Sequence, residues 1–228
     1  VFTAFSGSHQ DTIKKGLSAL EQSNQPEWEV PYLPIDPADL GRSYEAVVRI
    51  NSQSGKGGIA FILEKDHGVS LPRRLQINLS EKVQKVADET GKEVMSRDIW
   101  KVFEKNYIAI QGKFELINYA LSSTEDSSGD PSDEVEITLK NANDAVSLKG
   151  VGGGPIEAFV SAVNNYFSTS ISVSDYHQHS VTSGADAKAA AFIELTLEGK
   201  NEWGVGIDGN TVKASFQAIV TGLNKLLT

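Results

Sequence analysis

The hydrophobic positions of this 228-residue chain follow a helical period in its first half and mostly a strand period in its second. Three stretches before residue 110 repeat apolar side chains every three or four positions, which is the spacing of one helix face. The stripes that this spacing predicts are Ile13, Leu17 and Leu20; Leu75, Leu79, Val83 and Val86; and Ile99, Val102, Phe103 and Tyr107. Ser8 or Asp11 could cap the first helix. We expect residues 66–112 to form a small helical subdomain.

A proline-rich segment separates the first two helical stretches. Pro31, Pro34 and Pro37 fix φ and bias the residues before them toward extended conformations. The sequence PYLPIDP therefore predicts a stiff, irregular connection. Residues 44–51 follow with alternating apolar and polar side chains, which is the period of a strand. A rigid connection that leads into a strand is typical of a segment that positions other residues.

The glycine-rich loop at residues 52–58 has two interpretations. Lys56 and exposed backbone N–H groups would suit a phosphate. However, the loop lacks the spacing of a Walker motif. We favour a hairpin turn that leads into a second strand at residues 59–63. Together with the first helix and the proline-rich segment, this β-hairpin would complete a linker subdomain over residues 1–65.

From residue 113 onward, the chain twice repeats the order of three strands followed by a helix. Alternating side chains predict the strands, and Pro155 is well placed to open the first of the two helices. The expected strands span 114–122, 134–140 and 145–150 in the first copy and 170–181, 188–198 and 201–207 in the second. A helix at 211–227 ends the second copy. The acidic stretch 122–133 is interpreted as a solvated hairpin insertion.

These patterns together predict an α+β protein. Small α/β linker and helical subdomains would be followed by a pseudo-symmetric duplicated βββα domain over residues 113–228. The two units of that domain would span about 113–169 and 170–228.

Several glycines and histidines are candidates for chemistry. Gly-Val-Gly motifs at 150–152 and 204–206 each precede a helix, whose N-terminal N–H groups and dipole suit a carboxylate. Such glycines can equally serve only to turn the chain from strand to helix. His177 and His179 share one strand face and could form half a metal site, but no third ligand is near in sequence, so surface histidines are favoured. His9 stands at a helix start, which is most often a surface or capping position.

Composition and charge limit the possible partners. The chain has 30 Asp and Glu against 21 Lys and Arg, and its net charge of −9 argues against nucleic acids and anionic membranes. It contains no Cys, which excludes disulfides and thiolate chemistry and fits a reducing compartment. No apolar run approaches the ~20 residues of a membrane span. Because the chain begins with Val-Phe-Thr, we expect a processed product or part of a longer protein.

Four features resemble the 2-isopropylmalate synthase family, in the long form found in bacteria and in fungal mitochondria. They are GSHQD at 7–11, PYLPIDPADLGRSYEAVVRINSQSGKGG at 31–58, DHGVSLPRRLQ at 66–76 and the two Gly-Val-Gly motifs. The resemblance covers nearly the whole chain and implies the C-terminal linker subdomains and leucine-regulatory domain of such an enzyme. The family's (β/α)₈ barrel, with its metal-binding His-x-His, has no counterpart in these residues.

The resemblance implies an acyltransferase that, as a whole protein, condenses acetyl-CoA with 2-oxoisovalerate in leucine biosynthesis. It implies a homodimer, a divalent metal (zinc, magnesium or manganese) in the barrel, and no cofactor in this fragment, which alone should be inactive. His9 and Tyr32 match family residues that reach into the partner subunit's barrel as catalytic groups. The location would be cytoplasmic, or mitochondrial in a fungus.

The resemblance also implies a site for L-leucine, a feedback inhibitor, between two regulatory domains. The matching positions are Gly152, Gly153, Gly154 and Ile156 in the first unit, and Val173, Tyr176, Ser180, Ala187 and Ile207 in the second. Backbone N–H groups of the glycines would hold the carboxylate, and the apolar side chains would surround the isobutyl group.

Two other functions remain open at this point. Citramalate synthases share the duplicated domain and sense isoleucine, but they match residues 31–58 less well. A stand-alone amino-acid-binding domain is the alternative from another class. A complete open reading frame would separate these possibilities. Both kinds of synthase require a barrel upstream, whereas a stand-alone amino-acid-binding domain does not.

Overall fold

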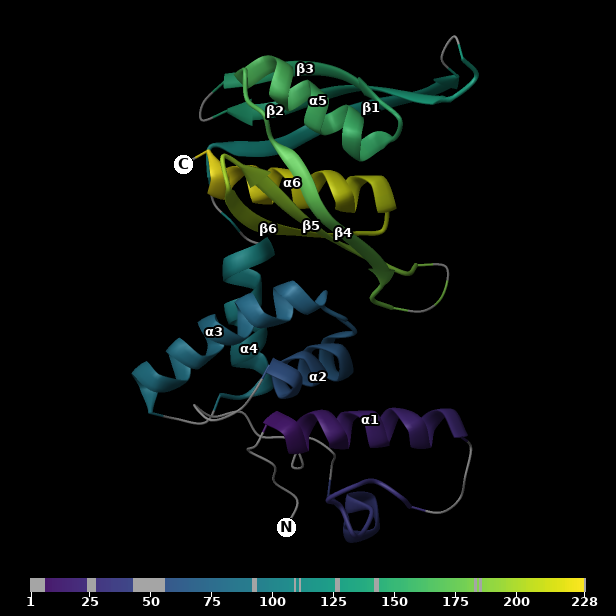
Figure 1. Cartoon of the computed structure of the whole chain (residues 1–228), viewed down its shortest axis with the longest axis vertical. Helices are drawn as coiled ribbons and strands as arrows, with labels where there is room; N and C mark the ends of the chain where they lie inside the picture. Colours follow the sequence, from purple (N-terminus) through teal and green to yellow (C-terminus); the bar gives the residue numbers. More distant parts are fainter. Residues whose placement is uncertain are drawn as a thin grey trace. The chain divides into compact units, whose positions relative to one another are not determined.

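The computed structural model describes residues 7–23, 28–42, 56–91, 94–108, 110, 112–125, 128–141, 144–182, 184 and 186–227 (Figure 1). The chain divides into two compact units, Val1–Phe103 and Glu104–Thr228. The finer division at residues 65 and 112 stays a prediction.

The first unit is helical. α1 (Gly7–Ser23) packs on α2 (Lys56–His67), and α2 contacts both α3 (Arg73–Thr90) and α4 (Ser96–Phe103). A short 3₁₀ helix, η1 (Pro37–Leu40), lies between α1 and α2 in the sequence. The predicted stripes supply much of the buried core: Ile13, Leu17, Leu75, Leu79, Val83, Ile99 and Phe103. The side chains of Ser8 and Asp11 lie outside the described part, so the first cap stays a prediction.

The predicted strand at residues 59–63 is wrong, because Ile59–Leu63 belongs to α2. Ile59, Ala60 and Leu63 are almost completely buried, whereas Phe61 is partly exposed. A short apolar run bounded by glycines has no period of its own, so a buried helix and a buried strand give the same pattern. The partner strand at 44–51 and most of the turn at 52–58 lie outside the described residues. Lys56, Gly57 and Gly58 begin the helix instead of closing a hairpin.

The second unit contains the predicted duplication. Its first sheet has the order β1 (Phe114–Glu125), β2 (Pro131–Asn141) and β3 (Asp144–Gly152), followed by α5 (Pro155–Phe167). Its second sheet has the order β4 (Ser172–Ser180), β5 (Ala189–Leu197) and β6 (Lys200–Asp208), followed by α6 (Thr211–Leu226). All neighbouring strands are antiparallel. The α+β class and the two βββα units are therefore confirmed. In the acidic stretch, residues 122–125 of β1 pair with residues 131–134 of β2.

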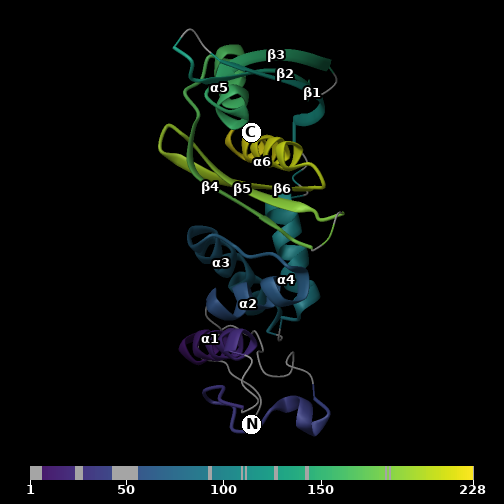
Figure 2. The same ribbon diagram turned by 90° about the vertical axis from the view of Figure 1, so that its right-hand side faces the viewer.

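The two helices of this unit lie between its two sheets (Figure 2). α5 packs on β2 and β3, while α6 packs on β5 and β6 and also reaches β1. One hydrophobic core therefore joins the two βββα halves of the duplicated domain. Ile137 and Leu148 come from the first half, and Ile193 and Phe216 come from the second. A short π-helical segment, η3 (Glu104–Ile108), contacts β6 and α6 and buries Tyr107. In the described part of the chain, no helix is both long and apolar enough to cross a membrane.

The Gly-Val-Gly motifs allow α5 to lie directly against β3 and α6 to lie directly against β6. A Cβ at Gly152 would stand 2.6 Å from the backbone nitrogen of Ala158 in α5. A Cβ at Gly204 would stand 2.6 Å from the backbone nitrogen of Gly222 in α6. Both distances are shorter than real Cβ contacts, so glycine is required by packing. The structural role left open above therefore applies to both motifs.

Candidate functional site

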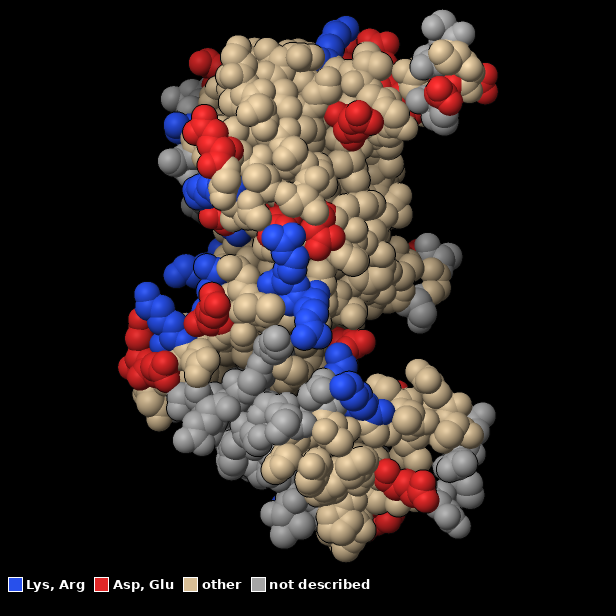
Figure 3. Space-filling view, viewed as in Figure 1, with Lys and Arg blue, Asp and Glu red and all other residues tan. Residues whose placement is uncertain are grey.

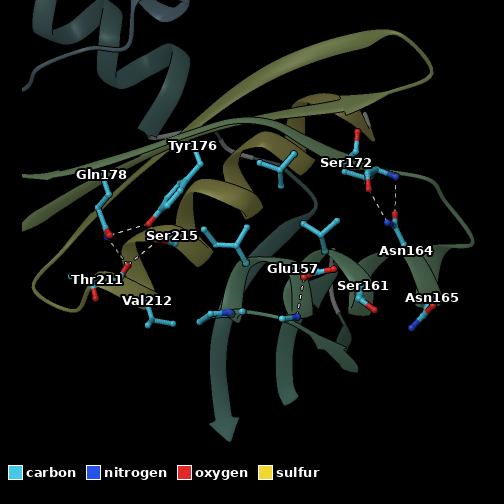
Figure 4. A pocket seen from close by; sticks show the side chains of 17 residues that line it. Glu157, Ser161, Asn164, Asn165, Ser172, Tyr176, Gln178, Thr211, Val212 and Ser215 are labelled. Carbon is cyan, nitrogen blue, oxygen red and sulfur yellow. Dashed lines mark hydrogen bonds between the residues drawn. The ribbon is translucent and has the colours of Figure 1, made fainter. Parts of the chain in front are cut away.

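A cavity of the second unit lies where the two βββα halves of the duplicated domain meet (Figure 4). It has a volume of about 950 Å³. One wall comes from the first βββα half of the duplicated domain, from the Gly153–Pro155 corner and α5, and the other comes from its second half, from β4 and the start of α6. The apolar lining residues are Pro155, Ile156, Val160, Ile171, Val173 and Val212. The polar lining residues are Glu157, Ser161, Asn164, Asn165, Ser172, Tyr176, Gln178, Thr211 and Ser215.

The N-terminus of α5 opens into this cavity. Gly154 is the N-cap residue and, having no side chain, supplies no side-chain hydrogen bond to the first turn. The N–H of Gly153 donates to Oε2 of Glu157 at 2.9 Å (Figure 4). Thus one backbone donor of the glycine corner is already paired with a carboxylate. The corner therefore holds an anionic oxygen of its own chain at the start of α5.

A hydrogen-bonded chain forms the opposite wall. The hydroxyl of Tyr176 donates to Oε1 of Gln178 at 2.9 Å, and Nε2 of Gln178 donates to the carbonyl of Thr211 at 3.0 Å. The hydroxyl of Ser215 donates to the same carbonyl at 3.1 Å. These bonds tie β4 to the first turn of α6 and hold the Tyr176 ring along the cavity.

Asn164 fastens the entry to β4 at the rim of the cavity. Its Nδ2 donates to the carbonyl of Ile171 at 2.8 Å, and its Oδ1 accepts from the N–H of the same residue at 2.8 Å. Asn224 in α6 makes the same pair of bonds, both 2.8 Å, to the N–H and carbonyl of Phe114 at the start of β1. Each of these two helices is therefore clamped by hydrogen bonds to the first strand, or the residue just before it, of the other βββα half. The pattern of the sequence did not reveal these clamps.

The structure brings together five of the nine positions implied for an effector. Gly153, Gly154, Ile156, Val173 and Tyr176 all line the cavity. The other four are Gly152, which packs against α5, and Ser180, Ala187 and Ile207, none of which lines it. The role of all nine stays a prediction. The sequence analysis did not predict three polar lining residues, Glu157, Asn164 and Gln178. Of these, only Glu157 could have been found from the sequence, because it lies in the first turn of the helix that Pro155 opens.

The two residues implied for catalysis lie together in the first unit. The rings of His9 and Tyr32 are 4.3 Å apart between centroids and tilted by 35°. His9 lies in α1, whereas Tyr32 lies in the turn before η1, and both are exposed to solvent. The structure therefore forms an exposed imidazole–phenol pair from segments that are separate in sequence.

The histidines of β4 do not form a metal site in the described structure. Nε2 of His177 lies 3.1 Å from a carboxylate oxygen of Asp175, and the His179 ring stacks on Phe192. Among the described residues, no group of three or more His, Asp or Glu side chains could hold a metal ion.

Comparison with known proteins relates both units to one kind of enzyme. Residues 1–64 match the family described as "Alpha-isopropylmalate synthase, post-catalytic domain-like", and residues 93–227 match the "LeuA allosteric (dimerisation) domain". The 2-isopropylmalate synthase of Rhodospirillum rubrum is 48% identical over 227 residues, 99% of this chain and 40% of that protein. Those of Rhizobium meliloti and Parafrankia sp. are each 46% identical, over 228 and 225 residues, again 40% of each relative.

The chain thus spans about two fifths of the length of the curated relatives it matches. The allosteric-domain match covers more than half of the chain and includes every residue of the cavity. The chain therefore belongs to the LeuA allosteric (dimerisation) domain family, in the form in which that domain accompanies the post-catalytic region of 2-isopropylmalate synthases.

Proposed function

We propose that this chain is the regulatory part of a 2-isopropylmalate synthase and that it binds L-leucine in the cavity between its two βββα units. The observation that carries the proposal is the cavity itself, which both halves of the duplicated domain build and which five of the nine implied positions line. The relatives reported above are 2-isopropylmalate synthases, which favours leucine over the isoleucine of citramalate synthases.

The two kinds of cavity wall would divide the recognition of leucine. The carboxylate would bind at the N-terminus of α5, near Gly153 and Gly154, where backbone donors and the helix dipole favour negative charge. It would displace Glu157, whose carboxylate could then receive the α-ammonium group. Ile156 and Val173 would cover the isobutyl group, where each buried methylene contributes ~0.8 kcal/mol. Alanine should therefore bind far more weakly than leucine.

A second copy of the chain would close the cavity. Val173 and Tyr176 remain 37% and 41% exposed although they line it, and a cavity of about 950 Å³ is much larger than one amino acid. Large exposed apolar side chains beside a ligand site are typical of an interface. Figure 3 shows that, among the described residues, the surface of the second unit over α5 has few charged side chains. A homodimer, consistent with the family description, would cover this surface.

The His9–Tyr32 pair would serve catalysis at the barrel of the partner subunit. Joining acetyl-CoA to 2-oxoisovalerate requires a base within hydrogen-bond reach of the acetyl methyl group. The imidazole of His9 can take that proton, and the phenol of Tyr32 beside it can donate a hydrogen bond. The divalent metal, whether zinc, magnesium or manganese, would belong to the barrel. Because that barrel is not among these residues, this chain alone should have no synthase activity. The whole enzyme would act in the cytoplasm.

Calorimetry on the chain tests the leucine site directly. We expect heat of binding with L-leucine, a weaker response with L-valine and none with L-alanine at the same concentrations. Val173→Phe should weaken binding by placing a bulky ring where Val173 would cover the isobutyl group, whereas Val151→Phe, at an exposed position of β3 outside the lining, is the matched control. Equal affinity for leucine and alanine would show that the domain is only a dimerisation scaffold. Tighter binding of isoleucine than of leucine would favour the citramalate synthase alternative.

A further inference from the structure

The backbone of Tyr32 is strained where it meets His9. Tyr32 has φ of +65°, in the left-handed region that side chains other than glycine rarely adopt. It is the third residue of a β-turn in which the N–H of Leu33 donates to the carbonyl of Val30 at 3.2 Å. Pro31 suits the second position of such a turn, but positive φ at the third normally requires Gly or Asn. Surrounding contacts must therefore hold Tyr32 in place.

Trp28 supplies the first of these contacts. Its Nε1 donates to the carbonyl of Leu33 at 2.7 Å, so the indole bridges the two sides of the turn. Val30 and Leu33 are buried on either side of the exposed Tyr32. The turn is therefore anchored at both ends while the phenol projects outward.

Gly16 supplies the second contact. It lies seven residues after His9, about two helical turns, and so near the same face of α1. A Cβ at Gly16 would stand 2.6 Å from Cδ of Pro31 and 3.3 Å from Cγ1 of Val30. Only a glycine lets the turn lie this close to the helix that carries His9. Glycine is otherwise unfavourable inside a helix, so the close approach explains its presence.

We propose that Gly16 and Trp28 are positioning residues that hold the Tyr32 ring against His9 and present the two rings as one preorganised group. The use of that group in catalysis rests on the proposed function, but the positioning itself does not. The matched helix control is Ser18→Ala, because Ser18 is exposed on α1 and has no part in the ring contact.

The first experiment reads the ring contact in the chain itself by nuclear magnetic resonance. His9→Gln assigns the His9 ring signals among those of the four histidines. We expect Gly16→Ala and Trp28→Phe to remove the nuclear Overhauser contacts between the His9 and Tyr32 rings, and Ser18→Ala to preserve them. Alanine favours the helix more than glycine does, so loss of the ring contacts in Gly16→Ala while the other α1 signals keep their positions would come from displacement of the turn and not from unfolding of α1. Persistence of the contacts in both variants would overturn the proposal.

The second experiment uses the whole enzyme. We expect Gly16→Ala to lower kcat per folded enzyme by about tenfold or more, with an unchanged KM for 2-oxoisovalerate, because misplacing a catalytic group affects the reacting step. A fall in kcat accompanied by an equal loss of folded protein would contradict a positioning role. If His9→Ala and Tyr32→Phe leave kcat unchanged, the proposed catalytic arm fails, while the spectroscopic result still decides the positioning.

Discussion

The two halves of the duplicated domain differ most at the N-termini of their helices. At α6, the side chain of Asn210 accepts a hydrogen bond from the N–H of Lys213 at 3.0 Å, and Lys213 lies 2.9 Å from Asp208. At α5, the cap residue is Gly154, which offers no side-chain bond, and the corner faces the cavity. The start of α6 is thus capped by a side chain of its own cap residue, whereas the start of α5 has no side-chain cap. Both helix ends line the cavity, but only the end of α5 lacks a side-chain cap.

Other features of the two halves are alike, and these serve the fold. Both third strands carry glycines against the helix, and both helices carry an asparagine clamp on the other unit's first strand. Substitutions in the shared glycines and asparagines should therefore lower the stability of the fold in either half. Substitutions at the N-terminus of α5 should instead affect ligand binding.

Replacing Gly204 by alanine should have the largest effect. The new Cβ would stand 2.6 Å from the backbone of Gly222, which cannot move without displacing α6. Overpacking of this kind costs about 3 kcal/mol of unfolding free energy. Gly209→Ala is the matched control, since nothing lies within 4 Å of its Cβ position. Urea unfolding measures both variants. Equal stability of the two would show that the Gly-Val-Gly packing has no structural role.

Removing the two asparagine clamps should produce unequal losses. Asn224 is only 4% exposed, so Asn224→Ala leaves a buried N–H and carbonyl without partners and should cost about 2 kcal/mol. Asn164 is partly exposed, so Asn164→Ala should cost about 1 kcal/mol. Only Asn164 lines the cavity, and only its loss should also weaken leucine binding. Weaker leucine binding in Asn224→Ala alone would contradict the placement of the site.

The strands and helices of the duplicated domain were predictable because one face of each is buried and the other is not. Val135, Ile137 and Leu139 alternate with Glu134, Glu136 and other polar residues, whose side chains lie on the solvent side of β2. No such contrast exists in the run from Ile59 to Leu63, which became a helix against expectation. Period alone cannot assign an element that is buried on most sides.

The candidate site was predictable only in part, for a different reason. Its glycine corner and Val173 were found through resemblance to a family, and the structure places them on one cavity. Gln178 and Asn164 contribute through bonds to backbone groups of other elements. A polar residue on a strand or helix carries no local sign of such a partner. Tertiary approach of the two halves, which no single segment encodes, is what makes these residues part of the wall.

Adding a cap to α5 should make the first corner resemble the second. Gly154 has φ of −169°, which any residue can adopt, and nothing lies within 4 Å of its Cβ position. Gly154→Ser should change stability by only a few tenths of a kcal/mol. Its hydroxyl would occupy donors of the first turn and weaken leucine binding about tenfold, the loss of roughly one hydrogen bond to a charged group.

The matched control for this change is Gly209→Ser, placed beside a helix end that Asn210 already caps. It should leave leucine affinity unchanged in calorimetry. If both serine variants weaken binding equally, the open end of α5 is not what holds the carboxylate.

The closed corner of α6 should give the smallest effect, visible only through pH. Burial raises the pKa of Asp208, but hydrogen bonds from the N–H of Asn210, from Lys213 and from Gln217 outweigh it, so the pKa lies below its ordinary 3.8. Between the two pKa values the unfolded chain binds more protons than the folded one, and the free energy of unfolding therefore rises with pH there. The stabilisation is complete above the unfolded pKa and is lost as pH falls through the folded one.

Asp208→Asn should remove this contribution. Measured against pH by urea unfolding, the stability of the variant should fall less steeply below pH 4 than that of the parent chain. Lys213 is largely solvated, so screening by salt should reduce the difference further. Parallel curves for the two proteins would mean that the carboxylate does not stabilise the α6 corner. The contrast between a closed and an open helix end would then depend on Asn210 alone, whose replacement by alanine should cost about 1 kcal/mol.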